Sequence, residues 1–146
     1  VQTCALPIYF LKGGFLGVDD FWGSYAWEIF AAEMRKIFSP SEYPMIDLPA
    51  DHPIFHTMFD LKGVLQVPSI NFWLSGRGTS ERGVDSAQVH ARGIADRNGR
   101  LMVFASHNTD ISDSWEREGE DPRYFYAFSP GGYQVAMNVL IYSMTH

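Results

Sequence analysis

The segment Gly13–Gly23, with the sequence GGFLGVDDFWG, constrains the fold of this chain more than any other. Its two adjacent glycines end a helix at little cost, because glycine adopts the left-handed conformation readily. The apolar run Phe15–Val18 then predicts a short buried strand, and Asp19 and Asp20 follow it directly. Ligands of α/β proteins bind beyond the carboxyl ends of the strands. The segment therefore predicts an α/β fold whose functional edge carries these two carboxylates.

The chain after this segment supplies one clear helix and one clear hairpin. Apolar residues at spacings of three and four predict a helix at Tyr25–Phe38, with Ser24 as its N-cap. The turn sequence DRNG, Asp96–Gly99, lies between the strand-like segments Val89–Ala95 and Arg100–Ser106 and indicates a β-hairpin. These elements are typical of a single α/β domain, the number that 146 residues suggest.

Weaker patterns predict the remaining elements. Tyr9–Lys12 is typical of the last turn of a helix, and Tyr133–Met144 predicts a closing helix that is apolar nearly all round and therefore covered. The other expected elements are a strand at Met45–Leu48, a capped helical turn within Pro49–Asp60 and a strand at Val64–Val67.

Composition excludes several classes of partner. The net charge is −6 and the basic residues are dispersed, which argues against a nucleic-acid partner or an anionic membrane surface. No apolar run approaches the roughly 18 residues of a membrane span. No cofactor is expected, whereas a small-molecule ligand or a protein partner is compatible with the sequence.

The first eight residues, Val1–Ile8 (VQTCALPI), resemble an in-frame translation of a common sequencing adapter. We therefore expect residues 1–8 to lie outside the natural domain. Cys4 is the one cysteine of the chain, so the natural part would hold no disulfide, thiol nucleophile or Cys-ligated zinc.

Several long motifs resemble a bacterial family known as domain of unknown function 4159, and the resemblance spans Tyr9–His146. The matching segments are Gly13–Gly23, Asp51–Asp60 (DHPIFHTMFD), Arg92–Asn108 (RGIADRNGRLMVFASHN), Asp110–Trp115 and Asn138–His146 (NVLIYSMTH). The resemblance implies a three-layer sandwich similar to flavodoxin and to class I glutamine amidotransferases. A more distant similarity to trehalose-utilisation-type proteins suggests a link to carbohydrates.

Family members usually carry one or two βα units before the Gly-Gly strand, and many begin with a secretory signal. The resemblance thus implies an extracytoplasmic location, in the periplasm or envelope. It also implies that residues 9–146 form a single α/β domain that is truncated at its N-terminus. We expect an exposed apolar sheet edge or helix face near Phe10, Phe15 and Leu16, where the absent units would pack.

Candidate catalytic residues lie after the two predicted strands of the functional edge: Asp19, Asp20, His107 and Asp110. A carboxylate here could act as a general base, accept a sugar hydroxyl or bind a metal. Alternatively, one Asp caps the following turn while the other accepts backbone hydrogen bonds, and His107 with Asp110 belongs to a turn that closes the strand. Where amidotransferases carry a nucleophilic cysteine, this chain has Asp-Asp-Phe-Trp, so glutamine hydrolysis by a thiolate is not expected.

His52 and His56 are four residues apart and would share one face of a helical turn, the spacing of a metal pair. Pro53 stands where the known metal-helix motif has a Glu. The alternative is that one ring packs against Phe55 while the other bonds the backbone, so no metal is expected and the two histidines are weak candidates.

Aromatic side chains beside the acidic motifs could stack on a sugar ring, and Trp22 and Trp115 are the best placed. Alternatively they belong to the core. The candidate ligand-binding residues are Asp20, Trp22, His52, His56, Asn108 and Trp115.

The sequence leads to three functional hypotheses. The first is a ligand-binding module, with a carbohydrate as one candidate ligand, in which these residues line one cleft. The others are a metal-assisted hydrolase that uses His52, His56 and Asp20 or Asp110, and an envelope-associated module that binds proteins.

Overall fold

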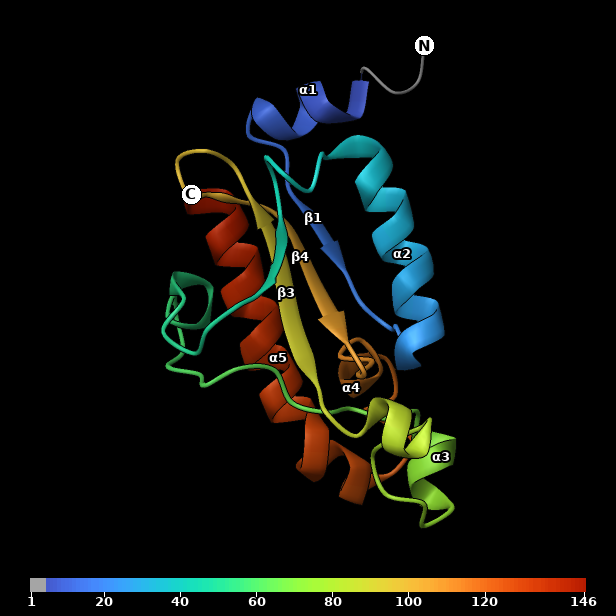
Figure 1. The fold of residues 1–146 in the computed structure, drawn as a ribbon. Helices are drawn as coiled ribbons and strands as arrows, with labels where there is room; N and C mark the ends of the chain where they lie inside the picture. Colours follow the sequence, from blue (N-terminus) through green and yellow to red (C-terminus); the bar gives the residue numbers. More distant parts are fainter. Residues whose placement is uncertain (1–4) are drawn as a thin grey trace.

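The computed structural model describes residues 5–146, so Cys4 lies outside the described part. A four-stranded mixed sheet forms the middle layer (Figure 1), and its strand order is β1-β4-β3-β2. The strands are β1 (Leu16–Val18), β2 (Met45–Asp47), β3 (His90–Ala95) and β4 (Leu101–His107). β1 runs parallel to β4, whereas β3 is antiparallel to both β4 and β2.

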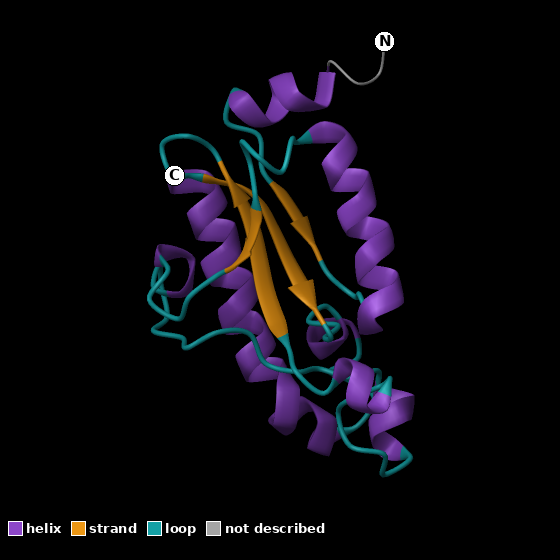
Figure 2. Cartoon of the chain, in the orientation of Figure 1, coloured by secondary structure: helices purple, strands orange, loops and turns teal. Residues whose placement is uncertain are grey.

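Helices cover both faces of the sheet (Figure 2), which confirms the predicted α/β three-layer sandwich. One face carries α2 (Gly23–Ile37), together with part of α1 (Ala5–Leu11), and the other carries α5 (Pro122–Thr145). The short helices α3 (Ile70–Leu74) and α4 (Asp113–Glu116) lie beyond the carboxyl end of β4. Two 3₁₀ turns, Pro53–Phe55 and Gly83–Ser86, complete the described elements.

β4 is buried along its whole length, as its continuous apolar run predicts. On the α2 side, Val103 and Ala105 pack with Phe30 and Met34. On the α5 side, Phe104 packs with Tyr142. The alternation continues past the apolar run, so that Ser106 lies on the α5 side and His107 on the α2 side.

The beginning of α2 differs from the prediction. Ser24 is not its N-cap; the helix begins at Gly23, and no side chain of the preceding residue caps it. Instead, Asn108 Oδ1 accepts a hydrogen bond from Gly23 N at 2.8 Å, and Asp85 Oδ2 accepts one from Ser24 N at 2.9 Å. The free N–H groups of this helix end are thus bound by side chains distant in sequence.

One further prediction was wrong. Val64–Val67 is not a strand; Val67 bonds to the segment after β4, through Thr109 Oγ1 and Asp110 N.

The apolar surface expected near Phe10, Phe15 and Leu16 is present. β1 lies at an edge of the sheet, and Tyr9 and Leu11 of α1 are 52% and 53% accessible. Phe10 itself is buried, because it packs 5.1 Å from the ring of Phe38.

The closing helix begins earlier than predicted, at Pro122, because Pro130 and the glycines after it lie inside α5 rather than before it. None of the helices in the described chain is long and apolar enough to cross a membrane.

Candidate functional site

Two residues with unusual backbone geometry mark the carboxyl ends of β1 and β4. Asp20 has a φ angle of 67° and Asn108 one of 63°, and among residues 5–146 they are the two non-glycine residues with positive φ. Phe21 O accepts a hydrogen bond from Asn108 N at 2.6 Å, so the two strand ends are joined at this point. Strained backbone of this kind concentrates at functional sites.

Asp19 ties this edge together through both carboxylate oxygens. Ser106 Oγ donates to Oδ1, and Ser112 N donates to Oδ2 at 2.8 Å. Burial raises the pKa of Asp19, and these two hydrogen bonds oppose the rise. The carboxyl group is therefore held in place by β4 and by the loop before α4.

Acidic side chains gather beside Asp19. Burial, followed by the charge of Asp110, raises the pKa of Asp20 to about 6, and Trp22 Nε1 opposes this by donating to Asp20 Oδ1 at 2.9 Å. Burial and the charge of Asp110 also raise the pKa of Asp113 to about 6. Negative charge is thus concentrated where β1 and β4 end, and ionisation of one of these groups opposes that of the others.

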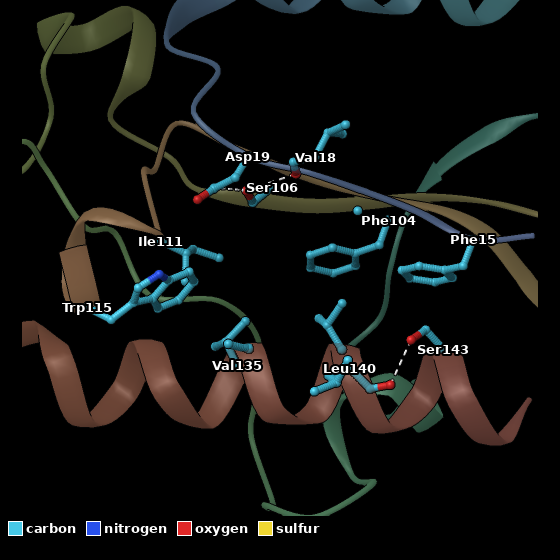
Figure 3. Close-up of a pocket in the computed structure, with 13 residues that line it drawn as sticks. Phe15, Val18, Asp19, Phe104, Ser106, Ile111, Trp115, Val135, Leu140 and Ser143 are labelled. Atoms are coloured by element: carbon cyan, nitrogen blue, oxygen red, sulfur yellow. Dashed lines mark hydrogen bonds between the residues drawn. The ribbon is translucent and has the colours of Figure 1, made fainter.

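An apolar groove of about 350 Å³ runs from this acidic edge along the α5 face of the sheet (Figure 3). Asp19, Ser106 and Trp115 lie at one end of it and Phe15 and Ser143 at the other. Aliphatic and aromatic side chains of the sheet, of the segment after it and of α5 form its walls, among them Phe104, Ile111, Val135, Val139 and Leu140.

The groove brings together some of the predicted residues and adds others. Asp19 and Trp115 line it, and Ile111 places it beside Asp110. The segments Arg92–Asn108 and Asn138–His146 contain Ser106 and several of the α5 residues, but their sequence does not mark these residues as lining a groove, since Ser106 is an ordinary polar residue in a strand. The period-two alternation of β4 is the one signal that places Ser106 on the same face as Phe104.

Asn108 serves the scaffold rather than the groove. Its side-chain Oδ1 accepts from Gly23 N, and its Nδ2 donates to Gln88 O at 2.7 Å. The residue is 3% accessible, so both ends of its amide are used inside the protein. Trp22 is buried as well, and its indole nitrogen is bonded to Asp20.

His107 lies on the opposite face, in a stack of side chains under α2. Its ring stacks on Trp27 at a centroid distance of 4.7 Å. Arg92 Nη1 donates to His107 Nδ1 at 2.9 Å, so His107 Nε2 carries the proton and donates to Gly23 O at 3.1 Å. Burial, with the charge of Arg92, lowers the pKa of His107. The ring is therefore neutral and fully bonded.

His52 and His56 lie away from this edge. His52 lines a pocket with the β3–β4 turn residues Asn98 and Gly99, at the other end of the sheet. His52 Nδ1 caps the 3₁₀ turn by accepting from Ile54 N at 3.2 Å. The exposed His56 bonds Ala50 O and Asp60.

The structure therefore does not bring the two histidines together with Asp20 or Asp110. Within residues 5–146, no group of three or more His, Cys, Asp or Glu side chains is arranged to hold a metal ion.

One comparison with known proteins gives a match. A family model described as "Domain of unknown function (DUF4159)" matches residues 2–144, nearly the whole chain. No curated protein and no solved structure matches the chain significantly.

Proposed function

The chain thus belongs to the DUF4159 family, and we propose that it is a ligand-binding module whose ligand lies in the groove between the sheet and α5. The observation that carries this proposal is a concave, mostly apolar groove that ends in a carboxyl group held by two hydrogen bonds. Small-molecule sites typically combine apolar walls with a few well-placed polar groups.

The composition of the groove specifies the class of ligand. Its walls come mostly from Val, Leu, Ile and Phe side chains, so the buried part of the ligand is apolar. At the polar end, the Asp19 carboxyl and Ser106 hydroxyl suit a ligand hydroxyl or amine. Trp115 offers an aromatic face beside them, on which a sugar ring can stack next to polar groups.

A thiolate mechanism has no support in this site, because none of the described residues that line the groove is a cysteine. A metal-assisted hydrolase would need His52 and His56 next to the acidic edge, where the structure does not place them. Binding without catalysis is accordingly the function that this geometry supports best.

The test is a binding screen on the 146-residue chain by ligand-observed NMR, followed by titration calorimetry of the hits. The panel contains amphipathic amines and alcohols with an apolar body, and mono- and disaccharides. We expect the amphipathic compounds to bind. Asp19→Asn and Ala136→Phe, which fills the groove from α5, should each weaken binding about tenfold or more, or roughly 1.4 kcal/mol.

Asp51→Asn is the matched control, since Asp51 is an exposed carboxylate outside the groove. Circular dichroism on each variant separates loss of binding from loss of folding. Binding that survives Ala136→Phe in a folded variant would place the ligand elsewhere and refute the proposal. Sugars binding in preference to the amphipathic compounds would refute the ligand class.

A further inference from the structure

Gly17 lies in the middle of β1, and its missing side chain opens the groove between Phe15 and Asp19. These three residues all line the groove, as the alternation of an extended strand requires. A Cβ added at Gly17 would lie 3.8 Å from Phe15 Cε1, an ordinary contact, so a larger side chain there would extend into the groove. From Phe15 to Asp19 this part of the groove is about 13 Å long, at roughly 3.3 Å per residue.

The Asp19 end of this channel has the two features that recognise an ammonium group. Ser106 Oγ and Ser112 N each donate to one oxygen of the Asp19 carboxylate, and each oxygen keeps a second lone pair for a ligand. The ring of Trp115 lies at the same end (Figure 3). A positively charged nitrogen is attracted both by a carboxylate and by the face of an indole ring.

The charges around this end favour a cationic head group over a neutral or an anionic one. Asp110 and Asp20 are the charged residues that face Asp19. The half-exposed Arg117 is paired with Asp113 at 3.7 Å. None of the described residues that line the groove is Lys, Arg or His. An ammonium group would therefore meet carboxylates here, whereas a carboxylate head group would be repelled.

We infer that the ligand is a primary amine on a single aliphatic chain, bound with its ammonium group at Asp19 and its chain over Gly17 towards Phe15. This inference rests on the proposed function and specifies the ligand of that groove. An extended chain of about ten carbons, with bonds of about 1.5 Å, spans the 13 Å or so between the two ends. The four-carbon stem of a lysine side chain is too short to do so.

Binding of such an amine should weaken in mild acid. Burial raises the pKa of Asp19, and burial with the charge of Asp110 raises the pKa of Asp20 to about 6. Glu81 and Asp113 are the other charged groups that face this pair. As pH falls from about 7 to 5 these carboxyl groups take up protons, whereas an alkylamine, with an ordinary pKa near that of lysine at about 10, keeps its charge. Affinity for the amine should fall at least about threefold over this range, and affinity for an alcohol should not change.

Titration calorimetry of the 146-residue chain with four probes tests the inference. Decylamine, decanol and decanoate share one tail and differ in the charge of the head, whereas butylamine has the same head as decylamine and a short tail. Decylamine should bind about tenfold or more tightly than decanol, and decanoate should bind most weakly. Butylamine should bind about a hundredfold or more weakly than decylamine, because it buries six fewer methylene groups.

Two variants separate the head from the tail. Asp19→Asn keeps the size of the side chain and removes its charge, so it should lower the preference for decylamine over decanol at least about fivefold. Gly17→Leu fills the channel, so it should weaken both probes about tenfold or more and leave the preference unchanged. Asp20→Asn should also lower the preference, and asparagine tolerates the φ of 67° at that position, so this variant serves if Asp19→Asn does not fold. Asp51→Asn, outside the groove, is the matched control and should change neither affinity.

Ala136→Phe distinguishes failure of this inference from failure of the proposed function. Probes that bind this folded variant as they bind the unaltered chain would refute the proposed function. Binding that Ala136→Phe abolishes, but that does not prefer decylamine to decanol, would refute the amine head alone. The inference is also overturned if decylamine does not bind, if decanoate or butylamine binds as tightly, or if the affinity for decylamine is the same at about pH 5 and 7.

Discussion

Replacement of Asn108 tests whether one buried amide holds the carboxyl edge of the sheet together. In Asn108→Ala the Gly23 N–H loses its acceptor, and because Gly23 is buried, water does not replace it. A buried donor without a partner costs about 1–3 kcal/mol. The Gln88 carbonyl also loses its donor, but Gln88 is exposed and can bond water instead, so it adds little.

Backbone conformation adds a second cost. Asn108 has a φ of 63°, a conformation that costs a residue such as alanine about 1 kcal/mol or more and glycine almost nothing. Asn108→Ala should therefore lower the free energy of unfolding by about 2–4 kcal/mol. Asn108→Gly should lose only the hydrogen bonds, so that its loss is smaller, about 1–3 kcal/mol.

Urea denaturation followed by circular dichroism measures both variants. With a slope near 2 kcal/mol per molar urea, Asn108→Ala should shift the midpoint down by about 1–2 M. Asn98→Ala, in the exposed β3–β4 turn, is the control and should leave the midpoint unchanged. A loss below about 0.5 kcal/mol in Asn108→Ala would refute the hydrogen-bond argument, and a glycine variant less stable than the alanine variant would refute the strain argument.

Two further predictions concern the acidic edge and the contact between α4 and α5. The pKa of Asp20 is about 6 in the folded chain against an ordinary 3.8. Between these pH values the folded state therefore binds more protons than the unfolded state, and the free energy of unfolding should fall as pH rises from about 4 to 6. In Asp20→Asn this fall should be shallower, whereas Asp51→Asn should keep it, and parallel stability–pH curves for all three proteins would contradict the assignment. Gly132→Ala should lower the free energy of unfolding by up to about 2 kcal/mol in urea denaturation, because the new Cβ would lie 2.6 Å from Ser114 Cβ. Overpacking of this kind costs about 1–3 kcal/mol, of which the gain in helix propensity offsets about 1 kcal/mol. Gly119→Ala meets no atom within 4 Å and should be neutral, so equal effects of the two would contradict the packing argument.

Local patterns predicted the parts of the fold whose causes are local. The turn DRNG forms as expected, with Asp96 N donating to Arg100 O at 2.8 Å and Gly99 at a φ of 85°. The strand after Gly13–Gly14 and the amphipathic stripe of α2 were predicted for the same reason. In each case a few neighbouring residues determine the backbone geometry.

The errors arise where distant residues determine the structure. Ser24 has the chemistry of an N-cap, but side chains distant in sequence bind the N–H groups at the start of α2. Asn108 accepts from Gly23 N, 85 residues away, and Asp85 accepts from Ser24 N, 61 residues away. The apolar segment Val64–Val67 has the composition of a strand, yet it meets only a turn after β4 and so has no partner for a ladder. No short window of sequence contains this information.

The predicted site residues lie on two faces of the sheet, because neighbouring residues in a strand point to opposite faces. Ser106 and His107 are adjacent in sequence, but Ser106 donates to Asp19 beside the groove while His107 stacks on Trp27 under α2. The end of β4 and the residue after it therefore contribute to two separate structures. His107 and Asn108 bond the beginning of α2, and Ser106 lines the groove. The sequence predicted from Asp19 and Asp20 the edge of the sheet at which acidic side chains gather, and only the face of each side chain separates the residues that hold this edge together from those that line the groove.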